Sequence, residues 1–299
     1  MNAEELYQLT AHSGALYALA HGRTPKALFS AGGDRVVAEW NLEREEINAF
    51  AVRTESTVYS LLNLDNKLII GTSNGGIHVI DLETKKELRH LKLHDKGIFH
   101  LFNDHSNSRV YACCADGSVS VWNPEDWSLL WHLHLSNQKI RRATQNSDAS
   151  LTAFACGDGK CILTENKNHQ VIFEIEAHEE SCNSLAFLPS GNLITGGKDA
   201  FLRMWDSNKG FSLIKEIPAH NYAIYDIIIN QESGWAATAS RDKTIKLWDL
   251  EFNDIPIRLD RAKKAGHLNS VNGLLMLDDN QFASCSDDRS IIIWKVDKN

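Results

Sequence analysis

The sequence predicts an all-β protein assembled from seven copies of one sheet-forming unit, and three observations support this prediction. An anchor residue returns roughly every 40 residues along the chain. An Asp or Asn stands six positions before each anchor. Each copy also holds four short apolar or alternating runs separated by polar turns, which is typical of strands. The anchors are Trp40, Ile80, Trp122, Thr164, Trp205, Trp248 and Trp294, and the turn residues are Asp34, Asn74, Asp116, Asp158, Asp199, Asp242 and Asp288.

The copy around Trp248 illustrates how the strands follow one another. Its four runs are Ala223–Ile229, Trp235–Ser240, Thr244–Leu250 and Ile255–Ala262, the last being the most polar. The connections between the runs are too short for a crossover, so the strands must be antiparallel. Because a lone four-stranded sheet cannot bury both of its faces, the copies must pack on one another.

Composition limits the classes of protein to consider. The chain has 299 residues, of which 43% are hydrophobic and 23% charged, and a formal net charge of −8. This acidity argues against a nucleic-acid partner. No apolar run approaches the roughly 18 residues of a membrane span, and the acidic N-terminus is not a secretory signal. The six cysteines lie in apolar runs without metal-ligand spacing, which predicts buried reduced thiols and a cytoplasmic location.

The period, the four strands and the Trp-Asp pairs at 205–206 and 248–249 resemble the WD-repeat β-propellers. This resemblance covers nearly the whole chain and implies one domain over residues 1–299, a ring of seven four-stranded antiparallel blades. It also implies a buried hydrogen-bonded tetrad in each blade, made of a His, a Ser or Thr, the turn Asp and the Trp. Complete sets are His12, Ser30, Asp34 and Trp40; His178, Thr195, Asp199 and Trp205; His220, Thr238, Asp242 and Trp248; and His267, Ser284, Asp288 and Trp294. The third copy has His94, Asp116 and Trp122 but Ala112 in the hydroxyl place, and the second and fourth copies depart from the pattern.

The two ends of the chain are expected to close the ring. The last copy has only three strands before the sequence stops, whereas Glu5–His12 aligns with Leu213–His220, a fourth strand and its following His. We therefore expect a strand at about residues 4–10 to complete the last blade, with Glu5–Leu9 beside Ile291–Trp294. Such pairing would remove two open sheet edges.

Several motifs that suggest chemistry have simpler interpretations. The His, Asp and hydroxyl sets are interpreted as scaffolding, because a catalytic triad has no reason to recur in four copies. The string at 71–75 matches G-x-S-x-G, but Ser73 is expected in a strand-to-strand turn, where a nucleophile elbow does not form.

His132 and His134 alternate on an expected outer strand, where a metal site is the alternative to an amphipathic surface. The basic segment 257–267 is expected to be a solvated strand and loop, with contact to an acidic partner as the alternative. No phosphate-binding loop is present. No enzyme activity, cofactor or metal is therefore expected.

The resemblance implies that partners bind the face on which the first strands begin. The positions concerned lie three and five residues after the tetrad His and one before the tetrad Asp. Here they hold Tyr17, Tyr59, Phe99, Lys139, Arg141, Ser181, Asn183, Lys198, Tyr225, Arg241, Asn272 and Asp287. Aromatic and cationic side chains are enriched at binding hot spots. We therefore expect a non-enzymatic protein-interaction scaffold, monomeric on its own, whose partner presents an acidic or mixed acidic–apolar segment.

Three alternatives to this function stay open from the sequence. The aromatic residues could plug the central channel instead of binding a partner. A second alternative is a propeller enzyme or small-ligand binder with its site at the channel mouth. A third is an RNA-binding propeller, in which bases stack on Tyr17, Tyr59 and Phe99 beside Lys139 and Arg141.

Overall fold

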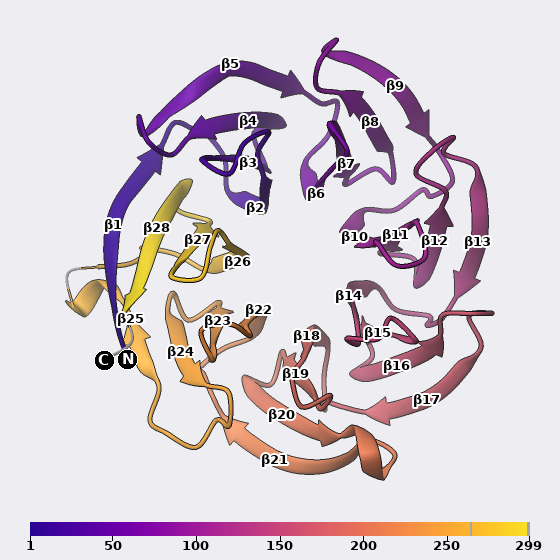
Figure 1. Cartoon of the computed structure of the whole chain (residues 1–299), viewed down its shortest axis with the longest axis vertical. Helices are drawn as coiled ribbons and strands as arrows, with labels where there is room; N and C mark the ends of the chain where they lie inside the picture. The colour runs from indigo at the N-terminus through magenta and orange to yellow at the C-terminus, as the bar shows by residue number, and fades with distance from the viewer. Residues whose placement is uncertain (264, 298–299) are drawn as a thin grey trace.

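The computed structural model describes residues 1–263 and 265–297 as a ring of seven four-stranded antiparallel sheets (Figure 1). This confirms the all-β, seven-bladed β-propeller expected from the sequence. Two single-turn 3-10 helices, η1 (Ser207–Lys209) and η2 (Arg261–Lys263), are the only helices in those ranges. Across the described part of the chain, no helix has the length and apolar character that crossing a membrane requires.

Each blade runs from an innermost strand beside the central axis to an outermost strand at the rim (Figure 1). Blade 1 comprises β2 (Leu16–His21), β3 (Ala27–Gly32), β4 (Val36–Asn41) and β5 (Glu46–Arg53). Blade 2 comprises β6 (Val58–Leu64), β7 (Lys67–Thr72), β8 (Ile77–Asp81) and β9 (Lys86–Leu91). Blade 3 comprises β10 (Ile98–Asp104), β11 (Arg109–Cys114), β12 (Ser118–Trp122) and β13 (Leu129–His134). Blade 4 comprises β14 (Ile140–Gln145), β15 (Leu151–Cys156), β16 (Lys160–Glu165) and β17 (Val171–Glu176).

The remaining blades follow the same plan. Blade 5 comprises β18 (Cys182–Phe187), β19 (Leu193–Gly197), β20 (Phe201–Asp206) and β21 (Ser212–Pro218). Blade 6 comprises β22 (Ile224–Asn230), β23 (Trp235–Ser240), β24 (Ile245–Asp249) and β25 (Ile257–Leu259). Blade 7 comprises β26 (Val271–Met276), β27 (Gln281–Ser286), β28 (Ser290–Asp297) and, outermost, β1 (Asn2–Thr10).

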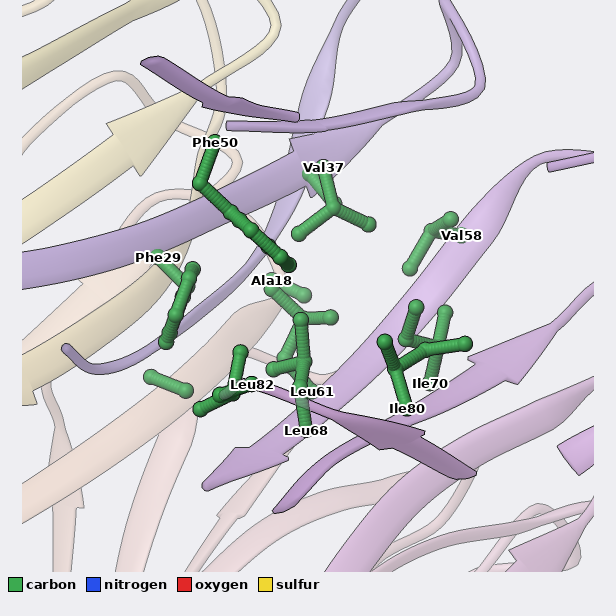
Figure 2. Close-up of a cluster of buried hydrophobic side chains, with 12 residues drawn as sticks. Ala18, Phe29, Val37, Phe50, Val58, Leu61, Leu68, Ile70, Ile80 and Leu82 are labelled. Carbon is green, nitrogen blue, oxygen red and sulfur yellow. The ribbon is translucent and has the colours of Figure 1, made fainter. Parts of the chain in front are cut away.

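Neighbouring blades are held together by apolar side chains packed between their sheets. Between blades 1 and 2, Phe29 and Phe50 meet edge to face with ring centroids 5.7 Å apart, and Val58 and Ile70 pack in the same cluster (Figure 2). These side chains are buried. Burying one such side chain contributes about 1.5–3 kcal/mol. Six further clusters of this kind occur in the described residues. The packing explains why the second strands are apolar or small, apart from a polar first residue in blades 2, 3 and 7, while the outermost strands carry many polar residues.

The N-terminal strand closes the ring as expected. β1 pairs antiparallel with β28, with Glu5 opposite Trp294 and Leu9 opposite Ile291. The strand is longer than the expected residues 4–10, because Asn2 already pairs with Asp297. The Tyr7 hydroxyl donates a hydrogen bond of 2.8 Å to the carbonyl oxygen of a blade 1 residue, which ties the closing strand to the next blade as well.

The turn between the second and third strands is the same in every blade. The residue after the turn Asp or Asn has a positive φ in all seven, namely Arg35, Gly75, Gly117, Gly159, Ala200, Lys243 and Arg289. In blade 3 a Cβ atom at Gly117 would lie 1.8 Å from the carbonyl oxygen of Ser136, so this blade requires glycine there, whereas blades 1, 5, 6 and 7 accommodate a side chain. The common turn brings each third strand back from the same face of the ring. Ser73 lies in one of these turns, between β7 and β8, as expected, and a strand-to-strand turn does not form a nucleophile elbow.

Blade 6 ends differently from its expected form. β25 covers only Ile257–Leu259 instead of residues 255–262, because Arg261–Lys263 winds into η2 and Ile255 is almost fully exposed. The basic segment 257–267 therefore falls on a short strand and a helical turn, and Lys264 lies outside the described residues. Within it, Arg258 forms an ion pair with Asp260 at 2.7 Å. All six cysteines are buried free thiols, as expected.

Candidate binding site at the channel mouth

In blade 6, four of the residues singled out from the sequence form one chain of hydrogen bonds. The Trp248 indole N–H donates to the Thr238 hydroxyl over 3.0 Å, and this hydroxyl lies 2.8 Å from Nε2 of His220. Nδ1 of His220 lies 2.9 Å from a carboxylate oxygen of Asp242. Because an ionised carboxylate can only accept, Nδ1 of the neutral ring donates to Asp242, and Nε2 accepts from the hydroxyl, which in turn accepts from the indole.

The same connections occur in blades 1, 5 and 7. The residues are His12, Ser30, Asp34 and Trp40; His178, Thr195, Asp199 and Trp205; and His267, Ser284, Asp288 and Trp294. In each chain the hydroxyl has no exposed surface. A nucleophilic hydroxyl must reach a substrate, so these sets are not arranged as catalytic triads.

Blade 3 completes its chain with a residue that sequence alignment missed. The hydroxyl comes from Ser120, which accepts from the Trp122 indole at 2.8 Å and lies 2.9 Å from Nε2 of His94. Ser120 is paired directly across the sheet from Ala112, the residue at the expected hydroxyl place. In blade 1 the equivalent pair is Ser30 and Ala38. In blade 3 the Ser and the Ala of this cross-strand pair have therefore exchanged places. The presence of Ser120 two residues before Trp122 is the sequence feature that could have revealed the exchange.

Blades 2 and 4 keep only part of this arrangement. In blade 4, Ser136 takes the place of the His and donates to Asp158 over 2.8 Å. In blade 2, the Thr72 hydroxyl donates to the Asn74 side chain over 2.7 Å. In both, the turn residue still accepts a hydrogen bond from the backbone N–H two residues further on. This local bond is found in all seven blades.

Hydrogen bonding sets the protonation states in the tetrads. Burial alone would raise the pKa of Asp242, but hydrogen bonds from His220, Thr244 and a backbone N–H hold it well below its usual range. Burial lowers the pKa of His220, against the opposing effect of Asp242. A neutral imidazole paired with an ionised carboxylate follows, which is a stable arrangement and not one poised for proton transfer at neutral pH.

Two clusters of the described residues have the composition of a metal site. The first is His78, Glu87 and His90 on the outer strands of blade 2. The two rings are stacked 4.1 Å apart with planes 23° from parallel, so their nitrogens cannot both point at one ion unless a ring turns. The second is His94, Cys114 and Asp116. Burial raises the pKa of the Cys114 thiol to about 12, so it is protonated and a poor ligand.

The expected outer-strand histidines of blade 3 are not brought together with a third ligand. The His132 ring packs against the tetrad ring of His94 at 5.5 Å. His134 lies 3.4 Å from the side-chain oxygen of Asn137. Neither belongs to a metal-like cluster of the described residues. The amphipathic-strand interpretation accounts for both.

A cavity of about 550 Å³ opens at the face of the ring where the innermost strands begin. In every blade this cavity is lined by the residue five positions after the tetrad His, or at the aligned position where the His is absent. We call it the plus-five residue. These residues are Tyr17, Tyr59, Phe99, Arg141, Asn183, Tyr225 and Asn272. Seven positions identified by sequence offset are thus brought to one place, one from each blade.

A β-bulge explains why these side chains reach the cavity. In every blade the register between the first and second strands shifts at one residue. In blade 1, for example, Leu16 pairs with Gly32 and Ala18 with Ala31, which leaves Tyr17 unpaired. The residue left out of the ladder is the plus-five residue in all seven blades. A bulge re-aims the side chain that it carries, and bulges are frequent beside functional sites.

Three of the bulge residues form a continuous aromatic arc over blades 1 to 3, which we define as Tyr17, Tyr59 and Phe99. The Tyr17 and Tyr59 rings meet edge to face at 5.7 Å, and the Tyr59 and Phe99 rings stack at 5.3 Å. The arc continues into blade 4, where the Arg141 guanidinium lies 5.0 Å from the centre of the Phe99 ring. Each of these side chains is half-buried and faces the cavity.

Two neighbouring arginines in blade 4 have different electrostatic surroundings. Arg142 forms an ion pair of 2.7 Å with the buried Asp226 of blade 6, across the front of blade 5. In the described residues, no carboxylate lies within ion-pair distance of Arg141, and its Nε is buried without a hydrogen-bond partner. Burial lowers the pKa of Arg141, with a partly compensating effect of Tyr225 and Tyr59. The guanidinium nonetheless stays charged, as arginine does in proteins.

Blades 5 to 7 contribute two amides, the ring of Tyr225 and two carboxylates, Asp226 and Asp287, to the cavity. The Asn272 side-chain amide donates to the backbone carbonyl of Leu16 at 2.8 Å and to Asp287 at 2.7 Å. The Asn183 amide donates to the Ile224 carbonyl at 3.1 Å, while its buried side-chain oxygen has no partner. That oxygen is an unpaired acceptor enclosed beneath the cavity surface.

Four of the expected binding residues lie outside the cavity lining. Lys198 forms an ion pair with Glu180, and Arg241 lies 6.0 Å from the ring of Tyr222. Burial lowers the pKa of Lys139, and the positive charges of Arg141 and Lys198 lower it further. Ser181, the other plus-three residue, is buried. These cations therefore surround the mouth without lining it.

The family model described as "WD domain, G-beta repeat" matches residues 85–123, 169–206, 211–249 and 261–295, together half of the chain. A protein named "Striatin homolog" from Dictyostelium discoideum is 22% identical over 83% of this chain, and human "Striatin-3" is 20% identical over 83%. "Autophagy-related protein 16" from Arabidopsis thaliana is 30% identical over 42% of the chain. The matches cover only 29%, 35% and 24% of the lengths of these three relatives.

Proposed function

The chain belongs to the WD-repeat family of β-propellers, and from this premise we propose that it is a non-enzymatic scaffold that binds a segment of a protein partner at the channel mouth. The observation that carries the proposal is the set of seven β-bulges. In each blade one residue of the first strand is left unpaired with the second strand, and the side chain of that residue lines the same cavity. A bulge of this kind disrupts the sheet ladder locally, re-aims the side chain that it carries, and is frequent beside functional sites.

The chemistry of the mouth favours a protein segment over the other ligand classes. Aromatic rings supply large apolar contact area, and an arginine beside them is the combination most enriched at hot spots. The rings are half-buried around a cavity that is still open, which favours binding over plugging of the channel. The neighbouring cations Lys139, Lys198 and Arg241 would steer an acidic or mixed acidic–apolar segment toward the mouth.

An enzymatic site at the mouth is less well supported. The cavity contains two carboxylates, Asp226 and Asp287. Asp226 is engaged by Arg142, and Asp287 accepts the amide of Asn272. No group in this set is arranged as a nucleophile with its base. The cytoplasmic location, the monomeric state and the absence of a nucleic-acid partner stay predictions from the sequence.

A quantitative pull-down tests the proposal. The Tyr59→Ala/Arg141→Ala double variant removes the central ring of the arc and the guanidinium beside its end. Both residues lie at bulges, outside the paired positions of the sheet, so the variant is expected to fold normally. It is expected to lose its partner. Circular dichroism and Tm establish folding, and mass spectrometry of proteins captured from the native host measures binding. The matched control is Arg44→Ala, an exposed arginine at the other end of blade 1. Full capture by a well-folded double variant would place the interface elsewhere on the molecule.

A further inference from the structure

The two ends of the aromatic arc carry opposite charges. Arg141 follows Phe99 at one end, in blade 4. Asp287 precedes Tyr17 at the other end, in blade 7, which adjoins blade 1 in the ring (Figure 1). The Asn272 amide donates both to Asp287, over 2.7 Å, and to the backbone carbonyl of Leu16, the residue before Tyr17, over 2.8 Å, which places that carboxylate beside the start of the arc. Around the mouth the order is therefore anion, three aromatic rings, cation.

Neither of these charges is neutralised within the described chain. Arg141 has no carboxylate partner, and Asp287 has no cation within ion-pair distance and accepts only from the Asn272 amide. The pair Arg142–Asp226 in the same cavity shows the contrast, since there the charges meet at 2.7 Å. Removing a charge from water without a counter-charge is costly. Two such charges at opposite ends of one binding surface indicate that the ligand supplies their partners.

The spacing of the arc sets the length of that ligand. Successive groups from Tyr17 to Arg141 are 5.7, 5.3 and 5.0 Å apart. An extended peptide advances about 3.3 Å per residue, so a run of about five residues covers the three steps. Side chains on one face of such a peptide recur about every 6.6 Å, which is close to the separation of the rings.

We propose that the mouth binds a short extended segment with a Lys or Arg at the Asp287 end, an Asp or Glu at the Arg141 end, and apolar side chains between them on the aromatic arc. The inference rests on the proposed function and adds the order of charges in the partner. Either chain direction satisfies the two charges.

Four pools of blocked heptapeptides test this charge order, because the first and seventh side chains of an extended peptide lie on the same face. The peptides are acetylated and amidated, so only side chains carry charge, and their five central positions mix Leu, Phe, Tyr and Gly. The terminal residues are Lys and Glu, Glu and Lys, Lys at both ends, or Glu at both ends. We expect at least one mixed pool to bind about three- to tenfold more tightly than either like-charged pool. Equal affinities for all four pools, or no binding to any, would overturn the inference.

Charge variants of the protein make the test specific. Arg141→Glu should shift the preference to the Lys/Lys pool, Asp287→Lys should shift it to the Glu/Glu pool, and the double exchange should restore the mixed preference. Asp287→Lys suits the fold, because Lys198 and Arg241 occupy the same place in blades 5 and 6. Arg44→Glu, with the same change of net charge away from the mouth, should leave the preference unchanged. Variants without effect on the preference would reject the inference.

A failure of the charge order can be told apart from a failure of the proposed function. Binding of all pools alike that is lost in Tyr59→Ala would reject the order of charges and still support a peptide site at the arc. Binding that survives both Tyr59→Ala and Arg141→Glu would contradict the site itself.

Discussion

At the scale of single residues, the recurring turn Asp is explained by a bond that needs no partner from elsewhere in the blade. In all seven copies the side chain of Asp or Asn accepts from the backbone N–H two residues on. This is the turn-stabilising bond that these side chains favour. Asn74 and Asp158 therefore keep their place in blades that lack the His. The tetrad adds to this local role only where a His is present.

The exchanged hydroxyl of blade 3 leads to a prediction. Ser120→Ala leaves the Trp122 indole and Nε2 of His94 without partners in the interior, which should cost roughly 2–4 kcal/mol of unfolding free energy. Adding Ala112→Ser returns a hydroxyl at the directly opposite place, as in blade 1, and should recover most of the loss. Urea unfolding of the two variants measures this. A double variant as unstable as Ser120→Ala would show that the two places are not equivalent.

At the scale of elements, the strands could be predicted because each is encoded by a local pattern. Three features depend only on the order of residues in the sequence: the spacing of the anchors, the turn residues, and the alignment of Glu5–His12 with a fourth strand. The plus-five offset located the cavity residues for the same reason, since one bulge per blade keeps the offset constant. The charge pairing could not be predicted. It depends on which side chains meet across blades, such as Arg142 with Asp226, and sequence spacing carries no such information.

The closing strand β1 leads to a prediction at this scale. Deleting residues 1–9 removes the pairing with β28, the burial of Leu9 and the Tyr7 hydrogen bond to blade 1. At about 1 kcal/mol per hydrogen bond plus the apolar burial, Tm should fall by about 10 °C or more. The exposed edge of β28 should also promote association, visible by light scattering. A synthetic peptide of residues 2–12 should restore the Tm, and an unchanged Tm after deletion would contradict the role of β1 in closure.

At the scale of the whole molecule, the tetrads determine how stability responds to acid. Burial lowers the pKa of His94, His178 and His220, so their neutral forms stabilise the fold above the unfolded value of about 6.5. That contribution is lost as the pH falls through their folded pKa values. Hydrogen bonds hold the pKa of Asp116 at about 2 despite burial, so its contribution is present above about pH 4 and lost below it. Tm should therefore be constant from pH 8 to 7 and fall below about 6.5, with a second decline below 4. A Tm that rises between pH 7 and 5.5 would contradict this.

The whole ring also presents two different faces, and the central claim is that a protein partner binds the one carrying the bulges. Site-specific photo-crosslinking in the native host tests this most directly. A benzophenone amino acid replaces Tyr59 at the mouth or, as the control, the exposed Glu83 in the turn at the opposite end of the same blade. After irradiation, denaturing electrophoresis and mass spectrometry identify the adducts. We predict a discrete protein adduct from position 59 and none from position 83. Adducts from position 83 alone, or identical adducts from both, would contradict binding at the channel mouth.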